Sequence, residues 1–229
     1  MKIGILQTGH APDELLPKEG DYDAMFRRLL ARGGFEFETY NVVDEEYPSG
    51  PEAADGWLIT GSKHGAYEDH PWIAPLEALI REIAASGKPL VGVCFGHQII
   101  AQALGGKVEK FPGGWAVGRQ SYILDGREVA VNAWHQDQVT ELPEGARVIG
   151  TNAFCENAVL TIGENILTIQ PHPEFGAAVI DGLIRYRSSA VPPELIENAR
   201  AGLEQETRQD ILRDMMIAQL RNEKLEAAQ

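Results

Sequence analysis

The segment Pro89–Gln98 constrains the fold more than any other part of the chain. There an apolar run ends in the pattern Gly-x-Cys-x-Gly, and helix-forming residues follow at once. This pattern is typical of a nucleophile elbow, a sharp turn from strand to helix that holds one reactive side chain above a sheet. A side chain at Gly92 or Gly96 would crowd such a turn. The segment predicts a strand, a turn at Cys94, and a helix whose N-terminus favours the charge of a thiolate.

The pattern on either side of the elbow predicts an α/β fold. Before it, expected strands (2–8, 35–43, 56–60 and 90–93) alternate with expected helices (22–32 and 72–85), which indicates a parallel sheet with right-handed crossovers. After residue 106 come shorter strands (117–124, 129–134, 147–151, 158–162 and 166–169) with a hairpin loop at 163–165. Helix returns after Phe175. We expect one domain over residues 1–229, a mostly parallel open sheet flanked by helices with additional antiparallel strands, and a C-terminal helical extension from about residue 190.

The acidity of the chain limits its partners. A formal net charge of −14 argues against nucleic acid and against an anionic membrane surface. No apolar run approaches the roughly 18 residues of a membrane span, and the apolar stretch at the N-terminus is too short for a signal peptide. A small-molecule substrate is therefore the expected partner.

Two cysteines, Cys94 and Cys155, do not make a disulfide framework, so a reducing cytoplasm is the expected location. We expect Cys155 to be structural. A buried structural role is also the alternative for Cys94, because a free cysteine commonly behaves as a small hydrophobe. The two flanking glycines favour the elbow instead.

A nucleophilic cysteine needs a base, and His172 is the strongest candidate among six histidines. It lies in the sequence Gln-Pro-His-Pro-Glu, where the following proline favours an extended backbone. In an extended segment residues i and i+2 point to the same side, so Glu174 should face His172 and orient its ring. A surface loop in which the two merely fall near prolines is the alternative. His135 is the rival base, although its strand offers no such carboxylate.

The other histidines near the elbow carry weaker expectations. His97 belongs to the helix after the elbow and should point away from the thiol. His64 and His70 lie in a segment rich in turn-forming residues, where they are expected to be solvated.

An acyl-transfer site also needs donors for an oxyanion. In an elbow the backbone N–H of the residue after the nucleophile is one such donor, and here that residue is Phe95. A second donor should come from a loop at the carboxyl end of a neighbouring strand. The N–H of Ser62 is our candidate, because Gly61 lets the backbone turn and approach closely. A plain glycine turn after a strand is the alternative.

The sequences VGVCFGHQ (91–98) and PHPE (171–174) together resemble the class I, triad-type, glutamine amidotransferase family, whose fold is flavodoxin-like. The resemblance covers most of the chain. It implies Cys94 as the nucleophile, His172 as the base and then the acid, and Glu174 as the group that orients His172. It further implies that Gln98 helps to hold the substrate.

The same resemblance implies a substrate-binding segment, Trp134–Asp137, whose backbone grips the amino and carboxylate end of glutamine. His135 is then a binding residue and not the base. Two positions depart from the family pattern. Gly61 is followed by Ser62 and lysine where the family commonly has Gly-Gly-Pro, and Trp134 stands where many members have serine.

The implied reaction is hydrolysis of a side-chain amide through a γ-glutamyl thioester on Cys94, with no metal and no organic cofactor. Three hypotheses follow. In the first, the chain is a glutaminase subunit that supplies ammonia to a synthase. No phosphate-binding loop occurs in the sequence, so the synthase active site would have to lie on another polypeptide. Alternatively it is a stand-alone γ-glutamyl peptidase or hydrolase, as its C-terminal helices and the loop at residues 62–69 suggest. The remote alternative is a non-catalytic regulatory partner.

Overall fold

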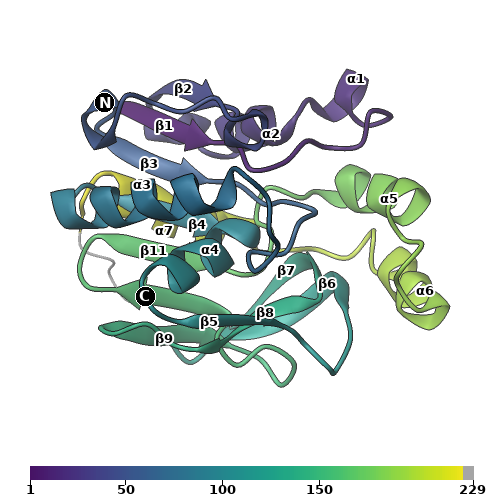
Figure 1. The fold of residues 1–229 in the computed structure, drawn as a ribbon. Coiled ribbons are helices and arrows are strands. Elements are labelled where there is room, and N and C mark those ends of the chain that lie inside the picture. Colours follow the sequence, from purple (N-terminus) through teal and green to yellow (C-terminus); the bar gives the residue numbers. More distant parts are fainter. Residues whose placement is uncertain (224–229) are drawn as a thin grey trace.

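The computed structural model describes residues 1–223; the last six residues of the expected domain and extension, 224–229, lie outside the described part. Within residues 1–223, nine strands form one sheet in the order β2-β1-β3-β4-β11-β10-β9-β6-β7 (Figure 1). The first five in this order are parallel: β2 (Glu36–Tyr40), β1 (Lys2–Leu6), β3 (Gly56–Ile59), β4 (Leu90–Val93) and β11 (Ile166–Ile169). Their carboxyl ends share one edge of the sheet.

Antiparallel strands extend the sheet beyond β11. They are β10 (Val159–Ile162), β9 (Ala146–Thr151), β6 (Ala116–Leu124) and β7 (Arg127–His135). The predicted hairpin at residues 163–165 joins β10 to β11, with Ile162 opposite Ile166. The predicted fold class, a mostly parallel open sheet with helices and added antiparallel strands, is confirmed.

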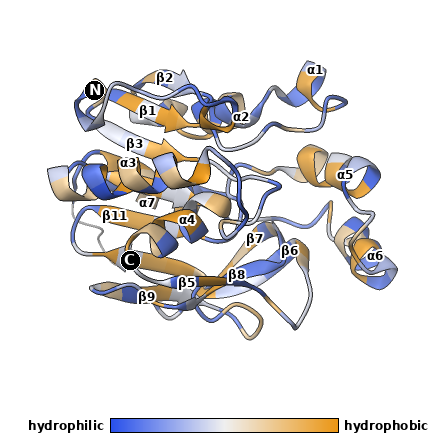
Figure 2. Cartoon of the chain, in the orientation of Figure 1, coloured by the Kyte–Doolittle hydropathy of each residue, from blue (hydrophilic) through white to orange (hydrophobic). Residues whose placement is uncertain are grey.

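The inner parallel strands β1, β3, β4 and β11 are buried on both faces, and each face has its own apolar core. On one face α3 (Ile73–Ser86) and α4 (Phe95–Ala103) pack on side chains that include Leu6, Trp57 and Leu90. On the other face α2 (Tyr22–Leu29) and α7 (Gln209–Leu220) pack on the alternate side chains, among them Ile5 and Val91. Figure 2 shows β1 and β11 as largely apolar and the helices as two-sided. Because neighbouring side chains on a strand point to opposite faces, continuous apolar runs such as 90–93 suit this doubly covered sheet.

Several element boundaries differ from the sequence prediction by one to three residues, as is common where the ends of elements fray into loops. The helix predicted over 22–32 ends at Leu29 and continues as a 3-10 turn, Ala31–Gly33. The strand predicted over 35–43 ends at Tyr40, before a second such turn, Val42–Asp44. A third short turn is Pro51–Ala53, and α1 (Leu16–Glu19) is a single helical turn.

Two strands were missed in the prediction. β5 (Lys107–Lys110) and β8 (Asp137–Glu141) pair with each other in a small antiparallel sheet. β5 carries one buried side chain, Val108, between charged residues, so the sequence offers too little alternation to identify it. β8 begins at Asp137, inside the segment expected to bind substrate.

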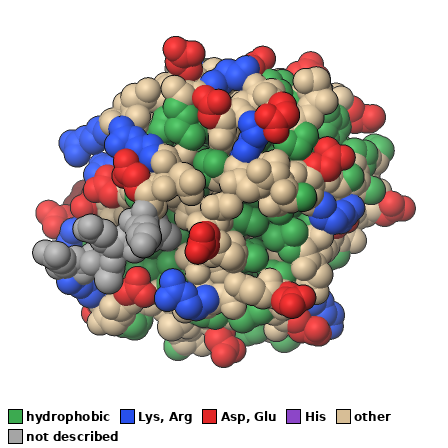
Figure 3. Space-filling model, turned by 90° about the vertical axis from the view of Figure 1, so that its left-hand side faces the viewer, with side chains coloured by type: hydrophobic (Ala, Val, Ile, Leu, Met, Phe, Trp, Pro, Cys, Tyr) green, Lys and Arg blue, Asp and Glu red, His purple; other side chains and the backbone are tan. Residues whose placement is uncertain are grey.

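The C-terminal helices pack back onto the sheet. α5 (Ala177–Tyr186) and α6 (Pro193–Ala201) lie at the carboxyl edge in Figure 1, and α7 returns across one face, where Met216 is fully buried. The neighbouring Met215 also packs against that core. The amino edge, seen in Figure 3, mixes lysine, arginine and acidic side chains, and no histidine is visible among the described residues on that face.

Candidate active site

The elbow at Cys94 has the predicted geometry. β4 ends at Val93, Cys94 adopts φ 52° and ψ −103°, and α4 begins at the next residue. A positive φ is strained for a residue other than glycine and persists where the surroundings over-determine it. Here they do, because a Cβ on Gly92 would lie 2.5 Å from the backbone oxygen of Gly96, and one on Gly96 would lie 2.3 Å from that of Ile59.

Backbone hydrogen bonds hold the elbow between two neighbouring strands. The N–H of Cys94 donates to the carbonyl of Ile169, at the end of β11 (2.8 Å). The N–H of Gly96 donates to the carbonyl of Thr60, just after β3 (3.1 Å). The sulfur is therefore fixed at the edge of the sheet where the carboxyl ends of three parallel strands meet.

The predicted contact between His172 and Glu174 is present. Nδ1–H of His172 donates to Oε1 of Glu174 at 2.7 Å, and both side chains are buried. The ring of Phe175 stacks on the imidazole, with 4.0 Å between ring centroids and 4° between planes. The backbone N–H of His172 donates to Asn132 on β7 (2.7 Å). Since Nδ1 is engaged by Glu174, Nε2 is the nitrogen left to interact with the side chain of Cys94.

The electrostatics of this pair favour a charged imidazole. Burial alone would lower the pKa of His172, but the charges of Glu174 and Cys94, and the hydrogen bonds to both, outweigh it and raise the pKa. A carboxylate that holds Nδ1–H fixes the tautomer and supports the imidazolium that forms when the ring takes a proton. The arrangement can therefore accept a proton from a thiol and return it.

Gly61 approaches this pair closely. A Cβ at Gly61 would lie 3.1 Å from Cε1 of His172 and 3.7 Å from Cβ of Cys94. The hydroxyl of Thr8 shares its proton between the carbonyls of Thr60 and Gly61 (3.0 Å each) and so anchors the turn after β3. The loop predicted to carry an oxyanion donor at Ser62 is thus beside the sulfur, and Phe95 opens α4, whose first N–H groups have no partner within the helix.

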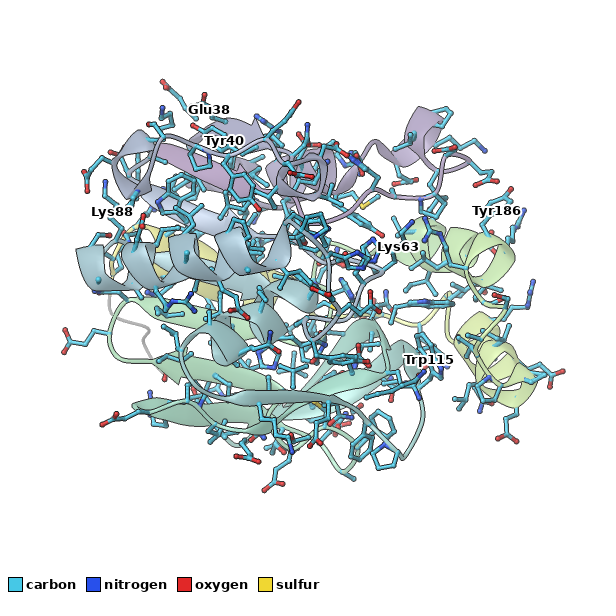
Figure 4. All side chains as sticks on the ribbon, viewed as in Figure 1. Glu38, Tyr40, Lys63, Lys88, Trp115 and Tyr186 are labelled. Carbon is cyan, nitrogen blue, oxygen red and sulfur yellow. The ribbon has the colours of Figure 1, made fainter. Side chains whose placement is uncertain are left out.

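A cavity of about 300 Å³ opens over the sulfur. Most of the predicted site residues line it: Gly61, Ser62, Cys94, Gln98, Trp134, His135, Asp137 and His172. Phe95 and Glu174 are buried behind the lining. Figure 4 labels two further lining residues, Lys63 and Trp115, on the side of the molecule where the parallel strands end.

Gln98 has a second role that the sequence did not indicate. Its amide nitrogen donates to the backbone carbonyl of Asp137 (2.9 Å) and to Oε1 of Gln170 (3.1 Å). Both amide protons are thereby used within the protein. Gln98 therefore ties the segment Trp134–Asp137 to α4, and Oε1 is the atom it can offer to a ligand.

The two histidines near this segment are neutral. Burial, together with the positive charge of His172, lowers the pKa of His135 to about 3, although the carbonyl of Asp137 accepts a hydrogen bond from its Nδ1–H. Burial also lowers the pKa of His97 to about 3, and its Nδ1 is hydrogen-bonded to the hydroxyl of Thr168 (2.8 Å). Neither has the carboxylate partner that His172 has, so their environments do not favour the role of base.

His64 and His70 differ from the expectation that they are solvated. Both contact the carboxylate of Glu68, and their rings pack against each other and against Trp72. Cys155, in contrast, fits its predicted structural role. It is buried beside Tyr122 and Ala158, and burial raises its pKa to about 12.

The cavity also includes residues that sequence reasoning missed. Phe175 could have been suspected, because it directly follows the His-Pro-Glu sequence. Tyr22, Lys110 and Arg187 come from three distant parts of the chain and join the lining through the tertiary fold. No local pattern in the sequence marks them.

Comparisons with known proteins identify the family of the chain. The family model described as Glutamine amidotransferase class-I matches residues 21–183. Gamma-glutamyl peptidase 4 of Arabidopsis thaliana is 35% identical over 193 residues, which cover 76% of this chain and 76% of that protein. A GMP synthase [glutamine-hydrolyzing] of Clostridium novyi is 31% identical over 172 residues, which cover 67% of this chain and 32% of the synthase.

A solved structure supports the fold over the whole length. The crystal structure of a glutamine amido transferase from Methylobacillus flagellatus has a TM-score of 0.77 and 19% identity, and the match covers 100% of this chain and 96% of that one. The chain belongs to the class I glutamine amidotransferase family. It is accordingly a hydrolytic enzyme of that family. Across residues 1–223, no helix combines the length and apolar character needed to cross a membrane.

Proposed function

We propose that the chain hydrolyses γ-glutamyl amide bonds through a thioester on Cys94, with His172 as proton carrier and Glu174 as the group that orients it. The observation that carries this proposal is the buried contact series of Cys94, His172 and Glu174 at the end of β4. The sulfur attacks the γ-carbonyl carbon, and the amide C–N bond breaks. His172 takes the thiol proton and gives it to the leaving amine.

Water then completes the reaction. His172 accepts a proton from water, the resulting hydroxide attacks the thioester carbonyl, and the sulfur leaves as glutamate is released. The N–H groups of Phe95 and Ser62 are our proposed donors for the oxyanion in both steps. No metal or organic cofactor takes part in this scheme.

The charges of the cavity support a γ-glutamyl peptide as the substrate. Lys63, Lys110 and Arg187 line it, in a chain whose net charge is −14. A γ-glutamyl peptide carries a carboxylate on its leaving amino acid, whereas the ammonia released from glutamine carries none. Asp137, which also lines the cavity, suits the α-ammonium group of the glutamyl moiety. The relative named gamma-glutamyl peptidase is consistent with this substrate class.

The packing of the C-terminal helices supports a chain that acts without a synthase. α6 packs on β6, and α7 covers one face of the sheet, which supports a single domain that includes the C-terminal extension. Other relatives are glutamine-hydrolysing GMP synthases, and this chain covers 32% of one of them. A glutaminase subunit with a synthase partner is therefore our second candidate. We place either function in a reducing compartment such as the cytoplasm, because Cys94 must remain a free thiol.

A substrate comparison tests the proposal. The purified chain alone is assayed on glutamine, on γ-glutamyl dipeptides, and on the same dipeptides with an amidated C-terminus. We expect the dipeptide acids to give a kcat/KM at least about tenfold above that of the amidated forms and of glutamine, since a paired carboxylate contributes on the order of 1–3 kcal/mol. Equal rates on all three, or activity that requires an added synthase, would favour the second candidate.

A further inference from the structure

We propose that His64, Glu68 and His70 form a binding site for a divalent transition-metal ion of the zinc class, at the wall of the cavity. The three side chains offer two imidazole nitrogens and one carboxylate oxygen, and the atoms all lie within 4.8 Å of one another. This binding site is separate from the Cys94 chemistry and does not depend on the proposed function.

The atoms already converge as ligands of one ion would. Oε2 of Glu68 lies 3.4 Å from Nδ1 of His64 and 2.7 Å from Nε2 of His70. Zinc bonds of about 2.0–2.1 Å in a tetrahedron place neighbouring ligand atoms about 3.3 Å apart, so small shifts suffice to admit an ion. Two histidines and one carboxylate are also a known zinc ligand set, with a fourth position left for water.

Groups around the cluster hold the ligands in place. The backbone N–H of Glu68 donates to the carbonyl of Gly65 (3.1 Å), and the N–H of His64 donates to Oγ of Ser62 (3.2 Å). The ring of His70 stacks on Trp72, with 5.9 Å between centroids and 10° between planes. Such supporting contacts orient metal ligands and are worth about 10–100-fold in metal affinity.

His10 shows that an imidazole between carboxylates is not by itself a site. Its Nδ1 contacts Asp21 at 2.6 Å, and its Nε2 contacts Asp44 at 3.0 Å. These two nitrogens are on opposite sides of the ring, so the three groups cannot converge on one ion. In the cluster, by contrast, Nδ1 of His64 and Nε2 of His70 both contact the same oxygen, Oε2 of Glu68.

The position of the cluster means that a bound ion would affect the wall of the cavity. His64 and Glu68 line the cavity, and between them Tyr67 donates a hydrogen bond to Asp137 (3.1 Å). An ion on the three ligands would fix residues 64–70 and with them the Tyr67–Asp137 contact. Any effect on turnover rests on the proposed function, whereas binding itself does not.

Metal titration of the full chain tests the site. A Cys94→Ala background removes the thiol, which would otherwise compete for soft ions. We expect this protein to bind one equivalent of Co²⁺, visible by its d–d absorption bands, and Zn²⁺ to displace it. Mg²⁺ at the same concentration should not displace it, because imidazole ligands favour the later transition metals.

Three further variants in the same background locate the ion. His70→Gln should weaken Co²⁺ binding by roughly 100-fold. If circular dichroism shows that His70→Gln is unfolded, Glu68→Gln takes its place, and it should weaken Co²⁺ binding as well. His10→Gln, the matched control, should leave it unchanged. Binding that is equal in the His70→Gln and His10→Gln proteins overturns the proposal. The proposal is also overturned if the wild-type chain binds Co²⁺ with a thiolate charge-transfer band and the Cys94→Ala chain does not bind Co²⁺, because the ion then lies on Cys94.

Discussion

The two cysteines of this chain lie in opposite environments although both are buried. Cys94 is 5% exposed and Cys155 is 1% exposed. Cys94 ends a strand, precedes a helix, and has the imidazole of His172 beside its sulfur. Cys155 lies in a small apolar cluster, where burial raises its pKa to about 12.

Burial therefore does not decide the role of a cysteine in this chain; the neighbouring charge does. A thiol without a cationic partner stays neutral in an apolar surrounding and is inert. At Cys94 the partner is itself held by Glu174 and Phe175. Four experiments probe this contrast between the two thiols, and we expect the first to have the largest effect.

Replacing each cysteine in turn tests the contrast most severely. Cys94→Ala should lower kcat on a γ-glutamyl dipeptide by at least about 10⁴-fold, as the loss of a nucleophile does in related chemistry. Cys155→Ser should leave kcat unchanged, because Cys155 does not line the cavity. Thermal unfolding of both variants checks that the fold is retained. Residual activity in Cys94→Ala would show that the nucleophile lies elsewhere.

Alkylation by iodoacetamide between pH 6 and pH 9 compares the two thiols directly. The raised pKa of Cys155 favours its neutral form, so at these pH values about 10³-fold less thiolate is present than for an ordinary thiol of pKa 9. The raised pKa of His172 keeps its imidazolium beside Cys94 over the same range. Mass spectrometry should find one label, on Cys94, in the folded chain and two in denaturant. Labelling of Cys155 first would contradict the assignment of the two roles.

Glu174→Gln removes the charge that supports His172 while keeping an oxygen for its Nδ1–H. The imidazole then loses the largest of the interactions that raise its pKa, so its pKa falls and the proton needed by the leaving amine is lost at lower pH. We expect kcat to fall by roughly 10²–10⁴-fold and the alkaline limb of its pH profile to move to lower pH. An unchanged profile would mean that Glu174 does not act through His172.

Gly61→Ala adds a methyl group 3.1 Å from the His172 ring and 3.7 Å from Cβ of Cys94. The ring must shift by a few tenths of an ångström, and such displacements cost up to about 100-fold in rate. We expect kcat to fall by roughly 10–100-fold. Gly176→Ala is the matched control, because a Cβ there meets no atom within 4 Å and its φ is negative. Equal kcat in the two variants would place Gly61 outside the site.

Much of the fold was predictable because its signals are local. The continuous apolar run at residues 90–93, the glycines at 92 and 96, and the alternation of strands and helices before residue 106 each depend on neighbouring residues. The contact of His172 with Glu174 was also local, since it depends on two prolines and a spacing of two. β5 was not predictable, because its one buried side chain gives no periodicity and its partner β8 is about 30 residues away.

The cavity wall was less predictable than its centre. Lys110 and Arg187 reach the cavity from β5 and from just beyond α5, a proximity that depends on how whole elements pack. Gln98 was predicted only to help hold the substrate. Its role in tying the segment Trp134–Asp137 to α4 was not predictable, because its amide protons bond to Asp137 and Gln170, which are far along the chain. His64 and His70 were expected in water because the sequence around them is rich in turn formers. Their shared partner, Glu68, became evident with the loop conformation.

The most direct test of the proposed chemistry is to trap the thioester. The wild-type chain is mixed with a γ-glutamyl dipeptide, quenched in acid within the first turnover, and digested for mass spectrometry. We predict a γ-glutamyl group on the peptide that contains Cys94, and none after Cys94→Ala. Steady turnover with the γ-glutamyl group on another residue, or with no covalent adduct at any quench time, would contradict a thioester on Cys94.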